Sequence, residues 1–209
     1  MFDFKAIGDA LIACDAAKVL ELVKSGLSQG VPAKDLLNQG LIAGMDVVGE
    51  RMENEEMFIP EVLMAAKAMN AAVNVLKPLL AQSDVGSQGK VVIGTVKGDL
   101  HDIGKNLVAM MLESAGLEVY NLGVDVAPDK FVNEIKAKNA NILALSALLT
   151  TTMPMMKETV AAVANAGIRE KVKILVGGAP VTQSFAMEIG ADGYAPDAGS
   201  ATRLAKSLL

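Results

Sequence analysis

The sequence predicts an α/β fold that follows a separate N-terminal bundle of helices. Three observations lead to this prediction. Residues 1 to about 81 carry apolar side chains at helical spacings of three and four. Residues 82–89 are polar, contain glycine and lack periodicity, which is typical of a linker. From residue 90 onward, short apolar runs alternate with amphipathic segments, as in a parallel sheet covered by helices. We therefore expect a helical-bundle cap domain at 1–88 and an α/β domain at 89–209.

Four helices with short connections are expected in the first domain, which together make an up-and-down bundle. Asp3 and Asp15 are suitable N-caps for the first two helices, and Gly26 and Gly30 are suitable stops. The expected helices are 4–13, 16–25, 32 to about 52, and 60 to about 80. The methionines expected to fill gaps in the bundle core are Met52, Met57, Met64 and Met69.

Five βα units are expected in the second domain. The expected strands are 91–96, 118–121, 142–146, 174–176 and 193–194, and the expected helices are 105–115, 128–138, 153–166, 182–189 and 197–207. Five parallel strands joined by right-handed crossovers favour a flavodoxin-like (Rossmann-type) sheet, which binds ligands at the carboxyl ends of its strands.

Composition and charge argue against several classes of protein. The single Cys14 cannot form an internal disulfide, which points to a reducing cytoplasm. No apolar run approaches the ~18 residues of a membrane span. The net charge of −5, without a basic block, argues against a nucleic-acid partner. We expect a cytoplasmic protein that binds neither membrane nor nucleic acid.

Chemically distinctive residues follow the ends of four predicted strands. They are Asp99, His101 and Gly104 after the first strand, Ser146, Thr150, Thr151 and Thr152 after the third, Gly177 and Gly178 after the fourth, and Tyr194, Ala195 and Asp197 after the fifth. Each also has an ordinary explanation as a helix cap or turn. Because the carboxyl ends of parallel strands meet at one edge of a sheet, their convergence there favours a binding site.

His101 is the only histidine in the chain, and its neighbours limit the chemistry it can perform. Asp99 can accept a hydrogen bond from one imidazole nitrogen and leave the other free to bind a metal. Cys14 lies in the other domain, so no cysteine nucleophile is expected beside the histidine. One histidine is too few ligands for zinc, but it suffices for a metal whose other positions are filled by a macrocycle.

Three motifs and their spacing resemble the cobalamin (corrinoid)-binding module of B12-dependent methyltransferases. That family has D-x-H-x-x-G, then 41 residues, S-x-L, then 26 to 28 residues, and G-G. This chain has Asp-Leu-His-Asp-Ile-Gly at 99–104, Ser-Ala-Leu at 146–148 and Gly-Gly at 177–178. Residues 47–52 and 57–61 resemble the four-helix cap that precedes the module in methionine synthase. The resemblance covers almost the whole chain, and it is greatest to the corrinoid proteins of methylamine, methanol, betaine and aryl methyl ether demethylation.

The resemblance implies a role for each matching residue. His101 is implied as the cobalt ligand that displaces the cofactor's own base, with Asp99 and Thr152 as its hydrogen-bonding relay. Residues implied to line the channel for the nucleotide tail are Gly104, Ser146, Leu148, Thr150, Gly177 and Gly178, with Tyr194 and Ala195 closing its far end. Residues implied to shield the upper face of the corrin ring are Met52, Ile59, Val62 and Leu63.

The function implied by the resemblance is that of a methyl carrier. Its cofactor is expected to be cobalamin or a related corrinoid that alternates between methylcob(III)alamin and cob(I)alamin. Expected partners are a substrate:corrinoid methyltransferase, a second methyltransferase acting on tetrahydrofolate or coenzyme M, and a reductive activation protein. Methyl transfer is expected only with these partners, and the linker at 82–89 is expected to be a hinge that lets the cap move aside.

Three alternatives remain open on the sequence. The chain could be the cobalamin subunit of an adenosylcobalamin mutase, although such subunits usually lack the N-terminal bundle. It could be a B12-dependent sensor, although sensors generally carry a DNA-binding or signalling domain. It could also be a flavodoxin-like protein without a corrinoid.

Overall fold

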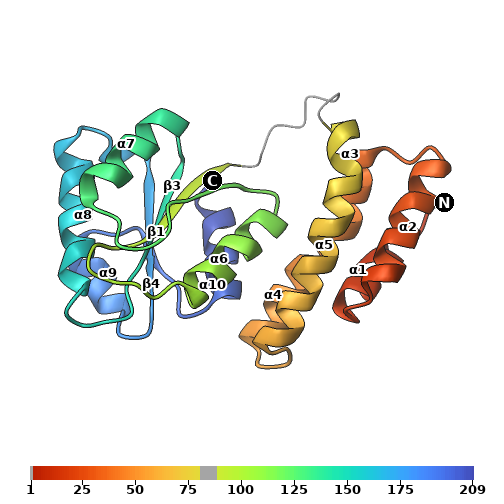
Figure 1. Ribbon diagram of the computed structural model, residues 1–209, viewed down its shortest axis with the longest axis horizontal. Helices are drawn as coiled ribbons and strands as arrows, with labels where there is room; N and C mark the ends of the chain where they lie inside the picture. The colour runs from red at the N-terminus through yellow and green to blue at the C-terminus, as the bar shows by residue number, and fades with distance from the viewer. Residues whose placement is uncertain (1, 81–88) are drawn as a thin grey trace. The chain divides into compact units, whose positions relative to one another are not determined.

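The computed structural model describes residues 2–80 and 89–209, which form a helical unit and a sheet unit (Figure 1). The linker predicted at 82–89 lies, except for Gly89, outside the described residues. The predicted boundary between two independently folding domains stays a prediction. Within the described residues, no helix is both long and apolar enough to cross a membrane.

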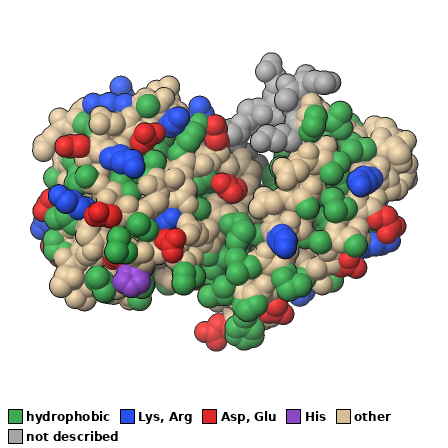
Figure 2. All heavy atoms as spheres, in the orientation of Figure 1, with side chains coloured by type: hydrophobic (Ala, Val, Ile, Leu, Met, Phe, Trp, Pro, Cys, Tyr) green, Lys and Arg blue, Asp and Glu red, His purple; other side chains and the backbone are tan. Residues whose placement is uncertain are grey.

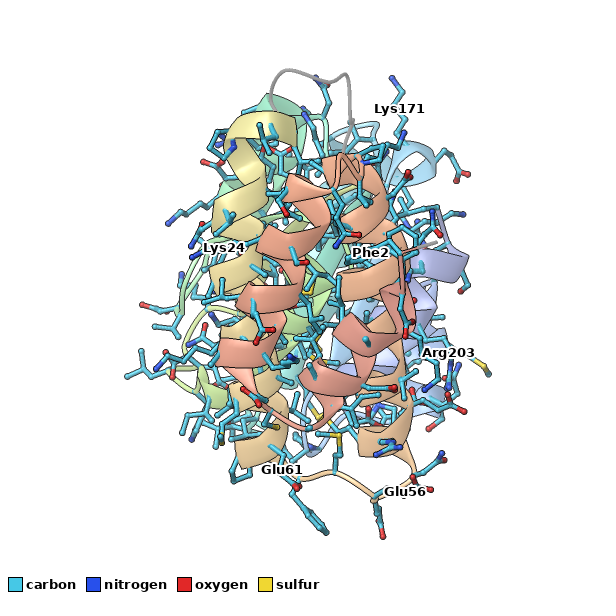
Figure 3. The ribbon with its side chains drawn as sticks, turned by 90° about the vertical axis from the view of Figure 1, so that its right-hand side faces the viewer. Phe2, Lys24, Glu56, Glu61, Lys171 and Arg203 are labelled. Carbon is cyan, nitrogen blue, oxygen red and sulfur yellow. The ribbon has the colours of Figure 1, made fainter. Side chains whose placement is uncertain are left out.

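The first two helices begin where the sequence predicts. Helix α1 spans Phe4–Ile12 and α2 spans Ala16–Ser28. The side chains of Asp3 and Asp15 accept hydrogen bonds from the backbone N–H groups of the first turns, as N-caps do. Gly26 is not a stop, because α2 continues to Ser28 and Gly30 then adopts a positive φ of 78°. Gly26 instead gives room to Leu36 and Phe2. A Cβ at that position would lie 2.6 Å from Cδ2 of Leu36 and 3.0 Å from the ring Cζ of Phe2, which is labelled in Figure 3.

The third predicted helix is continuous but changes its hydrogen bonding in the middle. It consists of α3 at Ala33–Asp35, a π-helical segment η1 at Leu36–Ile42, and α4 at Ala43–Glu53. Gly40 and Gly44 bring this helix close to α1. A Cβ on Gly40 would lie 2.9 Å from the Ile7 side chain, and one on Gly44 would lie 2.7 Å from the backbone of Gly8. Periodicity predicts the helix, whereas the π segment has no signal in the sequence.

Helix α5, at Ile59–Leu80, completes the bundle. Glu56 lies in the turn that joins α4 to α5, and Glu61 lies in the first turn of α5 (Figure 3). Its buried apolar side chains, Val62, Ala66, Met69 and Leu76, pack in the core of the helical unit. Met57 and Met69 are buried as predicted. Met64 is 55% exposed, so its assignment to the core is wrong.

The sheet unit has the predicted flavodoxin-like topology. Its strands are β1 Lys90–Thr95, β2 Glu118–Asn121, β3 Ile142–Ser146, β4 Lys173–Gly177 and β5 Gly193–Tyr194. All neighbouring strands are parallel, in the order β2-β1-β3-β4-β5. This confirms the predicted fold class.

Helices cover both faces of this sheet (Figure 1). They are α6 Ile103–Ser114, α7 Pro128–Lys138, α8 Met153–Asn165, the short 3₁₀ segment η2 Arg169–Lys171, α9 Gln183–Ile189 and α10 Ala198–Ser207. Helices α7, α8 and α9 pack against Val92 and its neighbours on one face. Helices α6 and α10 pack against Val91 and Ile93 on the other face. Successive strand residues face opposite sides, so a sheet covered on both sides requires continuous apolar runs such as that of β1.

Candidate functional site

The loop between β1 and α6, residues 97–102, carries the single histidine at the carboxyl edge of the sheet. Thr95 is the last residue of β1 and is fully buried. Its Oγ1 donates a 2.8 Å hydrogen bond to the carbonyl oxygen of His101. The end of the strand therefore holds the backbone of the histidine directly.

Asp99 is fully buried, and both oxygens of its carboxylate accept hydrogen bonds. Oδ1 lies 2.7 Å from Nδ1 of His101 and 3.1 Å from the backbone nitrogen of the same residue. Oδ2 accepts from the backbone N–H of Leu148 at 2.7 Å, from that of Leu149 at 3.3 Å and from the hydroxyl of Thr152 at 2.8 Å. The carboxylate thus joins the loop after β1 to the loop after β3.

These contacts keep Asp99 ionised. Burial raises the pKa of its carboxyl group, but the hydrogen bonds from Leu148, His101 and Thr152 outweigh burial and hold the pKa well below its usual value. A carboxylate can only accept hydrogen bonds, so Nδ1 of His101 must carry the proton that they share. In the neutral ring, Nε2 then has the free lone pair, which is the form of histidine that binds a metal.

His101 presents this ring to the surface, with its side chain 49% exposed (Figure 2). Apolar side chains surround it at the same edge. Leu100 is 72% exposed, Ile103 is 82% exposed and Leu148 is 41% exposed. Exposed apolar residues gathered around a potential metal ligand are suited to a large apolar ligand rather than to a hydrated ion.

The strand register brings the residues predicted after β3, β4 and β5 to this same edge. Ser146 pairs with Thr95 on one side and with Gly177 on the other. A Cβ on Gly177 would lie 3.0 Å from the carbonyl oxygen of Ala195. Gly178 has a φ of 129°, and a Cβ there would lie 1.9 Å from the carbonyl oxygen of Ala147, so only glycine fits.

The remaining predicted residues of the sheet unit lie around this edge in different environments. Thr150 is exposed on the loop after β3, and Thr152 is buried beside Asp99. Tyr194 is half-buried and packs against the core on the α7–α9 face, so part of its side chain has a structural role. Gly104 lies in the first turn of α6, where an added Cβ would meet nothing within 4 Å. Their roles toward a cofactor stay predictions.

The four residues predicted to shield a cofactor divide between the surface and the core of the helical unit. Ile59 is 48% exposed and Leu63 is 42% exposed, whereas Val62 is fully buried and Met52 is half-buried. Of the four, Ile59 and Leu63 offer the most surface to a ligand. The shielding role stays a prediction for all four.

Sequence reasoning missed two residues that hold the histidine loop. The sequence predicts Thr95 only as a strand residue. It does not mark Asp125, whose Oδ1 accepts a 2.7 Å hydrogen bond from the backbone N–H of Gly98 in the histidine loop. A threonine at the carboxyl end of an otherwise apolar strand is a signal that could have identified Thr95. No comparable signal marks Asp125, because its contacts depend on how two loops meet.

The residues present fit a metal that is held by one protein ligand and enclosed by a macrocycle. They supply an imidazole oriented by an ionised carboxylate, an apolar surface around it, and open space at Gly104. Models of the B12 binding domain match residues 4–77 and residues 89–203. The chain belongs to the B12-binding corrinoid proteins.

Relatives of this corrinoid protein match along almost its whole length. It is 45% identical to the dimethylamine corrinoid protein of Methanosarcina barkeri over 204 residues, which are 97% of this chain and 95% of the relative. A cobalamin-binding protein from Desulfitobacterium hafniense superposes with a TM-score of 0.87 at 33% identity and covers 100% of both chains. A chain of the methanol:cobalamin methyltransferase complex of Methanosarcina barkeri gives a TM-score of 0.84 at 30% identity, over 98% of this chain and 78% of that chain.

These matches confirm the predicted family, the fold of both parts and a corrinoid as the cofactor. The alternative of a flavodoxin-like protein without a corrinoid is wrong, because both parts of the chain match B12-binding models.

Proposed function

We propose that this corrinoid protein carries a methyl group between two methyltransferases. A substrate:corrinoid methyltransferase would load the methyl group, and a second enzyme would pass it to tetrahydrofolate or coenzyme M. The support is the kinship with a dimethylamine corrinoid protein and with a chain of a methanol:cobalamin methyltransferase complex. When bound, the corrinoid supplies a cobalt centre that takes up a methyl group and releases it again.

The observation that carries this proposal is the contact between Asp99 and His101. Nδ1 of His101 lies 2.7 Å from a buried carboxylate that stays ionised, so the proton on Nδ1 is held in place and Nε2 is free to bind cobalt. The negative charge behind the ring makes the imidazole a stronger electron donor. His101 is thus the metal ligand in this proposal, and Asp99 orients it and tunes its donor strength.

Thr152 can respond to a change in charge on this pair. Its hydroxyl lies 2.8 Å from Oδ2 of Asp99 and 2.9 Å from the carbonyl oxygen of Leu149. A hydroxyl group has one hydrogen and can donate only one such hydrogen bond at a time. It donates to the carboxylate while Asp99 is negative. When the Asp99–His101 pair gains a proton, it can donate to the carbonyl oxygen of Leu149 instead. The methyl group of Thr152 does not prevent this contact with Asp99.

The other predicted residues would bind the rest of the corrinoid. Small residues at the edge of the sheet, Gly104, Ser146, Gly177, Gly178 and Ala195, would leave room for the nucleotide tail, with Leu148, Thr150 and Tyr194 beside it. Ile59 and Leu63, with Met52 and Val62 behind them, would exclude water from the upper face of the ring. A reductive activation protein is proposed as a further partner.

A methylamine is the proposed class of methyl donor, because a relative with 45% identity is a dimethylamine corrinoid protein. The test is an anaerobic assay with reduced, cobalamin-loaded protein, dimethylamine and a dimethylamine:corrinoid methyltransferase. We expect the absorption spectrum to change from the reduced to the methylated cofactor only when all components are present.

Two controls decide the outcome of that assay. Replacing dimethylamine by methanol tests the class of donor, and the variant His101→Ala tests the ligand. A methylated spectrum with methanol but not with dimethylamine would overturn the choice of donor. Failure of the native protein with every methyltransferase of the family, together with an adenosyl-dependent radical signal, would favour the mutase alternative.

We also propose that residues 1–88 and 89–209 are domains that fold separately. The two segments are expected to give cooperative thermal unfolding when each is produced alone. A segment 89–209 that aggregates or fails to bind cobalamin without the bundle would contradict this division.

A further inference from the structure

The histidine loop, residues 97–102, is held from two sides. On the β3 side it is held by the carboxylate of Asp99, as described above. On the β2 side it meets residues 121–126, which comprise the last residue of β2 and the segment that follows this strand. None of the roles proposed so far uses this second contact.

Asp125 makes two hydrogen bonds to the histidine loop in opposite directions. Its Oδ1 accepts a 2.7 Å hydrogen bond from the backbone N–H of Gly98. Its own backbone N–H donates a 3.0 Å hydrogen bond to the carbonyl oxygen of Asp99. The backbone N–H of Gly98 and the carbonyl group of Asp99 are therefore both tied to one residue of the neighbouring loop.

The position of Asp125 is itself fixed by the end of β1. Backbone hydrogen bonds of 3.0 Å join Thr95 to Gly123 and Val126 to Thr95. Asp125 adopts a left-handed conformation with a φ of 52°, which aspartate, asparagine and glycine tolerate better than other residues. The side chain is exposed, so replacing it opens no cavity in the core.

A second contact ties the far end of the histidine loop to the same segment. Lys105 is 4% exposed, and its Nζ lies 2.7 Å from Oδ1 of Asn121 and also contacts Oδ1 of Asn106. Nδ2 of Asn106 donates a 2.9 Å hydrogen bond to the carboxylate of Asp102, the residue after His101. A buried ammonium group needs such partners, so this cluster stabilises the junction of the loop with α6.

We propose that Asp125 is a positioning residue for the cobalt ligand. It fixes the backbone of Asp99 from the side opposite Thr152 and thereby sets the direction in which the Asp99–His101 pair presents Nε2. The inference rests on the proposed function in one respect, namely that His101 binds cobalt.

The test uses two substitutions that differ in one hydrogen-bond acceptor. Asp125→Gly removes the acceptor and tolerates the left-handed backbone. Asp125→Asn keeps a carbonyl oxygen at the same place and also tolerates this backbone. Each is combined with His101→Ala, and the dissociation constant for cob(II)alamin is measured by absorption for the full chain.

We expect the His101→Ala change to weaken binding by a smaller factor in the Asp125→Gly background than in the native one. The expected difference is about fivefold, as for the loss of one ordinary hydrogen bond. In the Asp125→Asn background, the factor should match that of the native protein. Thermal unfolding of all variants without cofactor checks that the fold is kept, and a purely structural role would shift unfolding without changing this factor.

Three results would overturn or redirect the inference. If His101→Ala weakens cob(II)alamin binding by the same factor in the native and Asp125→Gly backgrounds, the inference is contradicted. An Asp125→Asn protein that behaves like Asp125→Gly contradicts the role of the acceptor. A His101→Ala change without effect in the native background instead contradicts the proposed ligand, which separates failure of this inference from failure of the proposed function.

Discussion

At Gly44 in the helical unit, the space that a side chain would occupy is filled by helix α1, whereas at Gly104 in the sheet unit that space is open. A Cβ on Gly44 would lie 2.7 Å from the backbone of Gly8, and one on Gly104 would meet nothing within 4 Å. Both glycines lie in helices, so the difference is one of surroundings. Gly44 allows two helices to pack closely, while Gly104 leaves room beside the histidine that a ligand can use.

The same contrast extends to how each unit holds its predicted site residues. In the sheet unit, hydrogen bonds to a buried carboxylate orient His101. In the helical unit, Ile59 and Leu63 are exposed apolar side chains with no comparable constraint from the core. The sheet unit therefore fixes the orientation of the His101 ring, whereas the helical unit offers an apolar surface.

The largest effect is expected at Gly178, where the fold itself requires a glycine. Gly178→Ala should lower the free energy of unfolding of the sheet unit by about 4 kcal/mol, since overpacking adds to backbone strain. Gly190→Ala is the matched control. Gly190 also has a positive φ, but a Cβ there meets nothing within 4 Å, so about 1 kcal/mol is expected. Urea unfolding that gives equal losses for the two variants would contradict the contact with Ala147.

Adjacent residues of α5 test the helical unit. Val62→Ala should lower its free energy of unfolding by about 2 kcal/mol because Val62 is fully buried. Leu63→Ala should change it by less than about 0.5 kcal/mol, since Leu63 lies at the surface. If Leu63 shields the cofactor, this variant should speed the oxidation by air of bound, reduced cobalamin. An unchanged rate of oxidation would show that Leu63 does not shield the cofactor.

Gly44→Ala separates packing from helix propensity. Overpacking against Gly8 should lower the free energy of unfolding by about 2 kcal/mol. The better helix propensity of alanine should raise it by about 1 kcal/mol. Calorimetry should therefore show a net loss of about 1 kcal/mol. A stabilised protein would show that α1 and α4 can move apart without cost.

Gly104→Ala should have the smallest effect on stability and a clear effect on binding. Nothing opposes the new methyl group in the cofactor-free protein, so the fold should be unchanged or stabilised by up to about 1 kcal/mol. Cobalamin binding should weaken, because the methyl group enters the space assigned to the corrinoid. Equally tight binding, measured by absorption titration, would show that the ligand does not approach Gly104.

Most of the fold could be predicted from the sequence, for identifiable physical reasons. Strands such as β3 are short apolar runs bounded by turn residues, and Asp197 signals the start of α10 as an N-cap. The π-helical turn at Leu36–Ile42 could not be predicted, because no residue type in this segment marks where i→i+5 hydrogen bonds replace i→i+4 ones. Met64 was misassigned because methionine is common both in cores and on exposed helix faces.

The site was predictable to a more limited extent. His101 and Asp99 could be identified because they are close in sequence and follow a strand. The contacts of Asp125 with Gly98 and Asp99 could not, since they join loops 27 residues apart whose meeting depends on the pairing of β1 with β2. Local motifs therefore predict the pairing of His101 with Asp99, and only the folded chain reveals which residues hold their loop.

The central claim is that the imidazole of His101 binds cobalt through the nitrogen that Asp99 leaves free. Electron paramagnetic resonance of protein loaded with cob(II)alamin tests it most directly, with nitrogen-15 incorporated into histidine. We expect the cobalt signal to show hyperfine splitting from one protein nitrogen that changes from the nitrogen-14 to the nitrogen-15 pattern on labelling and is lost in His101→Ala. A splitting that stays the same after labelling comes from the cofactor's own base and would contradict the binding of cobalt by His101.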